Sequence, residues 1–124
     1  MPFPVRRILL GLALLTLLPH AASARAMHMM DSTPKAESTV NGQHERYIVR
    51  FDGPVDHRGS SLRILHEGRL VRILHPLLNA APEVLFASGR RLPAGTYELA
   101  WSVKSAPDGE VTQGSIPFTV SGPR

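Results

Sequence analysis

The sequence predicts an all-β protein of about seven short strands, folded as an antiparallel sandwich or barrel. The first observation behind this prediction is an alternation of apolar and polar residues, with a period of two, along most of the chain after residue 45. The second is that turn signals containing Gly, Pro or Asp recur roughly every eight to twelve residues. The third is that no segment in this region carries the apolar stripe of an amphipathic helix.

The N-terminal segment is predicted to be a signal peptide. Arg6 and Arg7 precede an apolar run at residues 8–18. The sequence "AASARA" then supplies small residues at the −3 and −1 positions before a cleavage point after Ala26, which we favour over one after Ala24. The run of eleven residues is too short to span a bilayer as a helix. We therefore expect this segment to be removed on export, and no membrane span to remain in the mature chain.

Removal of residues 1–26 leaves residues 27–124 as one small domain of nearly balanced charge. Three of the fourteen basic residues leave with the signal peptide, so eleven basic residues remain with ten acidic ones. The high pI of the whole chain is therefore no sign of nucleic-acid binding. The sequence contains no cysteine, which excludes a disulfide framework, a thiolate metal site and a cysteine nucleophile. A metal would have to be bound by His, Met, carboxylate groups or the chain terminus.

The first half of the domain is predicted to hold a lead-in segment, one strand and a hairpin. Residues 31–41 are rich in Ser, Thr and Pro, and form either an extended lead-in or a loose tail. In "RYIVRF", residues 46–51, every second residue from Tyr47 is apolar and is expected to face the core, before the turn "DGP". The runs at residues 61–65 and 69–74 flank "HEG", which predicts a hairpin.

The second half is predicted to hold three further strands. "EVLFA", residues 83–87, follows a proline break. "GTYELAWSV", residues 95–103, alternates apolar and polar residues, so its aromatic residues, including Trp101, are expected in the core rather than in a binding surface. "GSIPFTV", residues 114–120, alternates in the same way. Its Pro117 indicates either an edge strand or a position in the ladder that needs no amide donor.

The order of these features resembles the CopC family of periplasmic copper-binding proteins. The stretches that carry the resemblance are "AMHMMDSTPKAEST", "VRFDGPVD" and "LPAGTYELAWSVKSAPDGEVTQGSIPFTV", and together they cover nearly all of residues 28–120. The most specific matches lie in the last stretch, with one extra residue allowed near its turn: Pro93, Gly95, Tyr97, Trp101, Ser105, Asp108, Gly109, Gly114, Phe118 and Val120. The resemblance implies a Greek-key β-sandwich, of the immunoglobulin-like or cupredoxin-like kind, located in the periplasm.

The family's Cu(II) site implies a set of ligands in this chain. That site typically uses an N-terminal His with its free amine, together with the Asp and the His of a "D-x-H" turn. Asp108 matches the Asp, but Glu110 stands where the second His is expected. His28 matches the second His of the "HAHL" opening found in many members, while Ala26 stands where the first would be. The implied metal ligands here are therefore His28, Asp108, Glu110 and Met27, the last as the new N-terminal residue.

The chemistry of these groups favours Cu(II). If cleavage leaves Met27 first, its amine, the amide nitrogen of His28 and the His28 imidazole offer three nitrogens, and Asp108 or Glu110 could complete a tetragonal plane. Replacing an imidazole by a carboxylate keeps a donor, but we expect it to lower affinity and increase pH sensitivity.

Cu(I) is the second possibility for the metal. The thioethers of Met27, Met29 and Met30 are soft ligands that suit Cu(I). The Met-rich Cu(I) loop of the family is not evident elsewhere in the sequence. We therefore expect Cu(II) in preference to Cu(I).

Simpler interpretations remain open for the same residues. "PDGE" is ordinary turn chemistry, which alone would explain Asp108 and Glu110. The other histidines of the domain are scattered over separate strands and turns, and each is expected to be a surface or hairpin histidine rather than a ligand: His44, His57, His66 and His75. No nucleophile elbow or phosphate-binding glycine loop appears, so an enzyme is not expected.

The sequence therefore predicts a periplasmic copper carrier or buffer for copper resistance or homeostasis. The family also implies transfer of copper to a partner, such as an inner-membrane copper transport protein. The alternative from a different class is a metal-free sandwich that kept the fold as a protein-interaction module after losing the "D-x-H" histidine. Glu110 favours this alternative, whereas the cluster of His28 with the neighbouring methionines favours copper.

Overall fold

The computed structural model describes residues 26–41 and 46–122, which form two β-sheets. Apart from Ala26, the predicted signal peptide lies outside the described residues, and so does His44. The strands of the described part are β1 (Met29–Thr33), β2 (Ser38–Val40), β3 (Arg46–Phe51), β4 (Ser61–His66), β5 (Arg69–Leu74), β6 (Val84–Ser88), β7 (Gly95–Lys104) and β8 (Val111–Val120). Within these ranges, no helix is long and apolar enough to cross a membrane.

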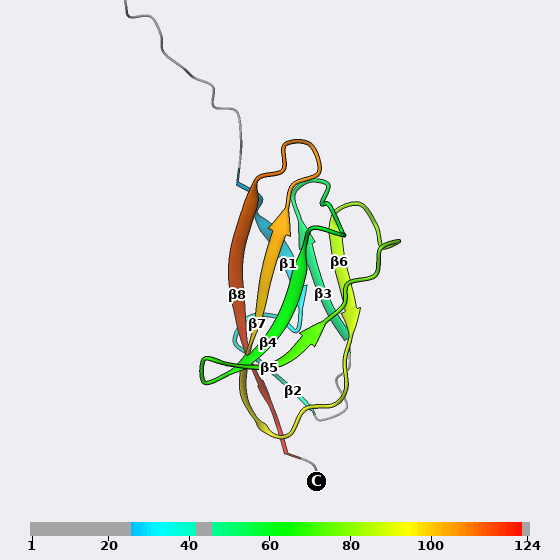
Figure 1. Ribbon diagram of the computed structural model, residues 1–124. Coiled ribbons are helices and arrows are strands. Elements are labelled where there is room, and N and C mark those ends of the chain that lie inside the picture. The colour runs from blue at the N-terminus through cyan, green and yellow to red at the C-terminus, as the bar shows by residue number, and fades with distance from the viewer. Residues whose placement is uncertain (1–25, 42–45, 123–124) are drawn as a thin grey trace, which may run out of the picture.

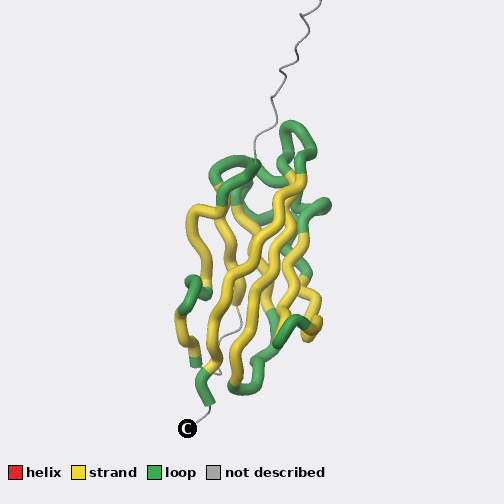
Figure 2. Tube along the Cα trace, turned by 90° about the vertical axis from the view of Figure 1, so that its left-hand side faces the viewer, coloured by secondary structure: helices red, strands yellow, loops and turns green. Residues whose placement is uncertain are grey.

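The two sheets face each other as the layers of a sandwich. One sheet has three strands in the order β1-β3-β6, and the other has five in the order β2-β8-β7-β4-β5 (Figure 1). All neighbours are antiparallel except β2, which runs parallel to the end of β8. Figure 2 shows the two layers from the side, with loops gathered at both ends. The predicted all-β, Greek-key sandwich is therefore confirmed.

The strands that the alternating pattern predicts are all present, and they bury the expected faces. Tyr47 and Val49 of β3 are fully buried, as are Leu99 and Val103 of β7. The predicted hairpin forms with β4 paired to β5, and Glu67 and Gly68 at its turn both have positive φ angles. Antiparallel neighbours with one face on the core produce this alternation because successive side chains point to opposite faces.

The segment at residues 31–41 forms structure rather than a loose tail, which raises the number of strands to eight within the described residues. Its first part belongs to β1, which pairs with β3, and its second part forms β2 beside β8. This second pairing also explains Pro117. Along its outer side, β8 has no described partner strand before Phe118, which is its first residue to pair with β2. The Pro117 carbonyl accepts a hydrogen bond from the Glu37 amide at 2.7 Å. Pro117 is therefore the last residue of β8 before this pairing begins, at the end of an open strand edge.

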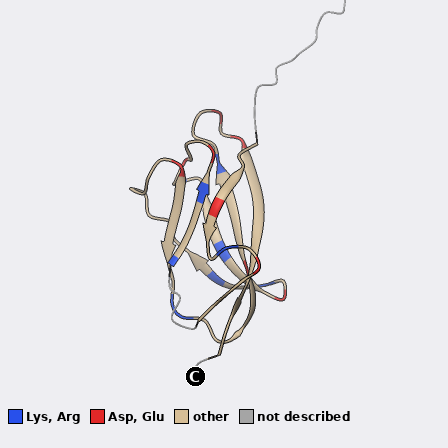
Figure 3. Ribbon diagram, turned by 180° about the vertical axis from the view of Figure 1, so that it is seen from behind, with Lys and Arg blue, Asp and Glu red and all other residues tan. Residues whose placement is uncertain are grey.

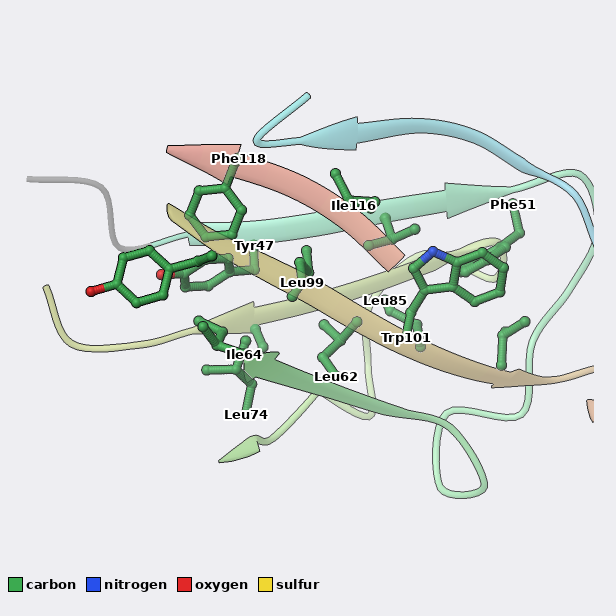
Figure 4. Close-up of a cluster of buried hydrophobic side chains, with 14 of the residues drawn as sticks. Tyr47, Phe51, Leu62, Ile64, Leu74, Leu85, Leu99, Trp101, Ile116 and Phe118 are labelled. Carbon is green, nitrogen blue, oxygen red and sulfur yellow. The ribbon is translucent and has the colours of Figure 1, made fainter. Parts of the chain in front are cut away.

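The core lies between the sheets and contains the aromatic residues that the sequence predicts there (Figure 4). At one end, Trp101 meets Phe51 edge-on with ring centroids 5.1 Å apart. At the other end, Phe118 lies between Tyr97 at 5.9 Å and Tyr47 at 6.4 Å. Such edge-on, tilted and stacked pairs add stabilisation beyond their buried area. The core therefore extends through the full length of the sandwich.

Tyr47 makes the stability of this core sensitive to alkaline pH. Burial raises the pKa of the Tyr47 hydroxyl above its ordinary value of 10.0, because the charged phenolate is disfavoured away from water. The unfolded chain therefore releases this proton first, and the free energy of unfolding is expected to fall as pH rises from 10 through the raised pKa of the folded state. Urea unfolding across this pH range measures the effect.

Tyr47→Phe is the variant that isolates this contribution. Its unfolding free energy should decline less steeply above pH 10 than that of the unmodified chain, because the buried ionisable group is gone. Tyr97→Phe keeps Tyr47 and serves as the matched control. Equal alkaline slopes for the unmodified chain and Tyr47→Phe would contradict this assignment.

Candidate metal site

Three segments that are distant in sequence meet at one end of the sandwich. They are the start of the described chain, the β3–β4 loop and the β7–β8 turn, which lie together at the top of Figure 1. The loop and the turn are joined by the bridge between Val55 and Ser105, and by the Ala106 amide, which donates to the Pro54 carbonyl at 3.1 Å. These backbone contacts place the "DGP" and "PDGE" sequences side by side.

The β7–β8 turn is built by its own backbone and by Asp108. The Gly109 amide donates to the Ser105 carbonyl at 2.9 Å, and the φ of Gly109 is +73°, a region that favours glycine. Asp108 Oδ1 accepts a hydrogen bond from the Glu110 amide at 3.0 Å. Asp108 therefore has the turn-forming role that "PDGE" predicts, and one of its oxygens carries out that role.

Met27 fixes the N-terminal segment to this end of the core. Its side chain is only 8% exposed and belongs to the core cluster, and its sulfur lies close to Gly53. Its amide nitrogen donates to Thr112 Oγ1 at 3.2 Å. Burial of this thioether holds the residues around position 27 in place, so the nitrogen donors here are not part of a loose tail.

His28 presents two of its nitrogens to a single carboxylate. The His28 amide donates to Asp52 Oδ1 at 3.0 Å, and His28 Nδ1 lies 3.1 Å from Asp52 Oδ2. The imidazole is 72% exposed, whereas the Asp52 side chain is 23% exposed. The Asp52 amide donates in turn to the His28 carbonyl at 3.0 Å. These contacts orient the amide nitrogen and Nδ1 of His28 toward the Asp52 carboxylate.

A hollow of about 320 Å³ brings part of the predicted set together. Its lining includes Met27, Asp52 and Asp108, and the other lining residues are Ala26, Gly53, Pro54, Ser105 and Pro107. His28 and Glu110 do not line it, and Glu110 is exposed on the turn. Among the described residues, no group of three or more His, Asp or Glu side chains is close enough to hold a metal ion by itself.

Asp52 is the candidate site residue that sequence reasoning missed. It lies in "FDGP", which reads as a turn signal, and its position next to His28 depends on the pairing of β1 with β3. In that pairing Met29 faces Phe51, so the residue before Met29 comes beside the residue after Phe51. Recognising that residues 29–33 form a strand opposite residues 48–51 would have been the signal.

The remaining candidate ligands are separated by the fold. Met27 and Met29 pack against the core, whereas Met30 is 55% exposed, so the three thioethers do not face one point. His57 Nε2 donates to the carbonyls of Ala81 and Val84, at 3.1 and 2.9 Å. His66 Nδ1 donates to the Thr96 carbonyl at 2.8 Å. One ring nitrogen of each histidine is therefore engaged with backbone carbonyls.

The loops at the end of the sandwich that holds this candidate site contain acidic residues, which are red on the ribbon (Figure 3). Asp52 and Asp108 line the hollow, and Asp56 caps the β3–β4 loop by accepting from the amides of Arg58 and Gly59 at 3.1 and 3.2 Å. A local excess of carboxylates attracts cations and supplies oxygen donors.

Comparison with known proteins identifies the family. The sequence model of the CopC domain matches residues 29–121. The chain belongs to the CopC domain family. The solved structure of CopC from Methylosinus trichosporium OB3b is 28% identical, with a TM-score of 0.70, and the match covers 80% of this chain and 97% of that one. The titin M3 domain is 12% identical with a TM-score of 0.45, over 77% of this chain and 96% of that one. No curated protein matches this sequence.

Membership of the CopC family confirms the resemblance seen in the sequence, and copper binding and copper resistance follow from it. Proteins of this family are periplasmic copper-binding carriers, not known as enzymes. Against the family pattern, this chain has Ala26 and Glu110 where histidines are expected. The fold nevertheless brings a His28–Asp52 pair to the same end as Asp108.

Proposed function

We propose that the mature protein is a periplasmic carrier or buffer that binds one Cu(II) ion at the end of the sandwich formed by Met27, His28, Asp52 and Asp108. The observation that carries this proposal is that His28 directs both its amide nitrogen and Nδ1 to the Asp52 carboxylate, beside a hollow lined by Met27 and Asp108. Copper binding follows from the CopC family, and this arrangement supplies the donors that the chain has in place of the missing histidines.

Nitrogen donors form the first half of the proposed site. Cleavage after Ala26 would turn the Met27 nitrogen into a free amine, next to the His28 amide. The amine, the deprotonated amide and Nδ1 of a histidine in the second position can close two adjacent chelate rings on one Cu(II) ion. Nδ1 is the ring nitrogen that this chelate requires, and it is the one that faces Asp52. Cu(II) prefers such nitrogen and oxygen donors in a plane.

Carboxylates form the second half. Asp52 already accepts hydrogen bonds from two of the three nitrogens, so it is the first candidate for the oxygen donor. Asp108 lines the same hollow and supplies negative charge, although its Oδ1 is used by the turn. Glu110 lies outside the hollow, and we assign it the smallest contribution. All of these donors bind copper only when deprotonated, so affinity should fall at acid pH.

The role as a carrier rests on the exposure of the site. The imidazole of His28 is 72% exposed, so a bound ion would remain accessible to a receiving protein. An inner-membrane copper transport protein is the partner that we propose for the transfer. Capture would occur at the acidic end of the sandwich, and release would require a competing set of ligands from that partner.

A Cu(II) titration of the exported protein tests this proposal. The full chain is expressed with its own leader and purified from the periplasm, and mass spectrometry identifies its first residue. Calorimetry and EPR should show one Cu(II) ion per chain with three nitrogen donors. The melting temperature should rise with copper, because a ligand that binds only the native state stabilises it. Asp108→Asn should weaken binding about tenfold, whereas Glu110→Gln should change it less than threefold.

The possible outcomes separate the two functions that the sequence leaves open. One-to-one binding with this order of effects supports the carrier. If Glu110→Gln weakened binding more than Asp108→Asn did, the copper ligand would be on the outside of the turn. That result would contradict the proposed geometry. No binding, and no change in melting temperature at copper well above micromolar concentration, would favour a metal-free interaction module.

A further inference from the structure

Exposed apolar side chains concentrate in one short stretch of the sequence, within and just after β5. Seven large apolar side chains are exposed in the described part of the chain, and five of them fall between residues 70 and 78: Leu70, Val71, Ile73, Leu77 and Leu78. Leu70 and Ile73 are each more than half exposed. Leu78 lines a different hollow, with Val55, Asp56, His57, Arg58 and Ala106, so the apolar surface that matters here is the part on β5 itself. Large exposed apolar side chains grouped on one strand of a small domain indicate a site of association.

The apolar residues lie on a strand with an open edge. β5 is the last strand of its sheet, and within the described residues it pairs only with β4. The register shifts at Val71, which forms a bulge. Beside the other edge of β5 is a hollow of about 560 Å³, bounded by Ile73 and His75 on one side and by residues 88–90 on the other. An unpaired strand edge next to a hollow can accept an added strand.

Arginine side chains surround this edge. Arg69 and Arg72 belong to β5 itself, Arg63 faces Ile73 across the β4–β5 pair, and Arg90 lines the hollow. Arg72 donates to the Arg90 carbonyl at 3.1 Å, which holds its charge over the hollow. The nearby acidic residues are Glu67 at the hairpin turn and Glu98 opposite Leu65. The edge is therefore apolar and basic together.

This combination determines the kind of occupant. A second copy pairing edge to edge would bring Arg69 and Arg72 of both copies together, and like charges placed opposite each other destabilise such a pair. The leader of the chain cannot supply compensating charge either, because residues 1–25 contain no Asp or Glu. A segment from another protein in which apolar and acidic side chains alternate can do both. Its apolar side chains can pack on the exposed apolar residues of β5, and its carboxylates can pair with the arginines.

We propose that the outer edge of β5 binds an extended segment of a partner protein in which apolar and acidic residues alternate. The segment adds as a strand to β5, places its apolar side chains against Leu70 and Ile73, and directs its carboxylates to Arg69, Arg72 and Arg90. This site is independent of copper, and its occupancy does not require the metal end of the sandwich.

NMR titration with short peptides tests the proposal on the full mature protein. The probe is a capped seven-residue peptide of alternating Val and Glu, and the control peptide has Lys in place of Glu. The Val-Glu peptide should bind at least about tenfold more tightly, lose affinity as salt is added, and shift the amide signals of residues 69–75 and 88–90. A Val-Glu peptide N-methylated at alternate residues, which lacks half of the backbone donors, should bind at least about tenfold more weakly.

Matched variants test whether peptide binding is specific to this surface. Ile73→Thr should lower the affinity for the Val-Glu peptide at least about threefold. Met30→Thr removes an equally exposed apolar side chain on β1 and should leave that affinity unchanged. Arg72→Gln should weaken binding, and Arg58→Gln at the opposite end should not. The proposal is overturned by equal binding of the Lys peptide, by shifts confined to residues outside 69–75 and 88–90, or by absence of binding. Dilution-dependent shifts at β5 without peptide would also overturn it, because the occupant would then be a second copy.

Discussion

His28→Ala is expected to reduce the affinity for Cu(II) by about a hundredfold or more, which corresponds to about 2.7 kcal/mol of binding free energy. The substitution removes Nδ1 and leaves only the backbone nitrogens and carboxylates, so one chelate ring is lost. A group that merely orients a ligand typically costs ten- to a hundredfold when it is removed, and a direct ligand should cost at least as much. Competition against a chelator of known affinity measures the change, and EPR should report one nitrogen donor fewer.

One control and one second site variant accompany His28→Ala. His75→Ala removes an exposed imidazole that lines the hollow beside β5 rather than the candidate metal site, and should leave copper affinity unchanged. Asp52→Asn keeps the shape but removes the charge that faces both nitrogens of His28, so it should cost about tenfold or more. Because the His28 ring is largely exposed, His28→Ala should change the unfolding free energy of the copper-free protein by less than about 0.5 kcal/mol. If Asp52→Asn bound copper as well as the unmodified chain did, the carboxylate would not belong to the site.

Gly114→Ala is expected to destabilise the fold by about 3 kcal/mol. Gly114 of β8 lies opposite Trp101 of β7, and the indole ring covers its backbone. A Cβ atom at this position would lie 2.3 Å from Cζ2 and 2.7 Å from Cε2 of Trp101, far inside contact distance. The ring is 7% exposed and meets Phe51 on another side, so it has little room to move. Urea unfolding followed by circular dichroism measures the loss.

Two further variants show whether Trp101 is the cause. Gly122→Ala meets only the Ala94 Cβ at 3.7 Å and should change stability by less than about 0.5 kcal/mol. In a Trp101→Leu background, where the ring is absent, the additional cost of Gly114→Ala should fall below about 1 kcal/mol. If Gly114→Ala were as destabilising in the Trp101→Leu background as in the unmodified chain, the strain would lie in the β8 backbone rather than against the indole.

The fold and the core were predictable because they depend on local pattern. In β7, Leu99, Trp101 and Val103 alternate with polar or small residues, and this alone indicates a strand with one buried face. The hairpin at Glu67 and Gly68 was predictable for the same reason, because its turn residues stand between two apolar runs. Such features are fixed by a few neighbours in the chain.

The contacts that define the candidate site were not predictable, because each depends on pairing between distant strands. Asp52 meets His28 only through the register of β1 with β3. The role of Gly114 likewise depends on which residue of β7 lies opposite, which the sequence of β8 does not state. Asp108 could be assigned to a turn from its neighbours, but its place on the hollow with Met27 required the docking of that turn on the β3–β4 loop.

The bridge between Val55 and Ser105 has a consequence for the order of events during folding. The parts of the metal end come from the beginning, the middle and the last third of the domain, and Met27 donates to Thr112 across 85 positions of the chain. Contacts of such long separation are slow to form because a large loop must close first. Under the proposed function, a newly made chain would therefore offer copper only the local nitrogens around His28, and the carboxylates would join after the sheets have come together. Loading of the complete proposed site would then be a late step that reports on completed folding.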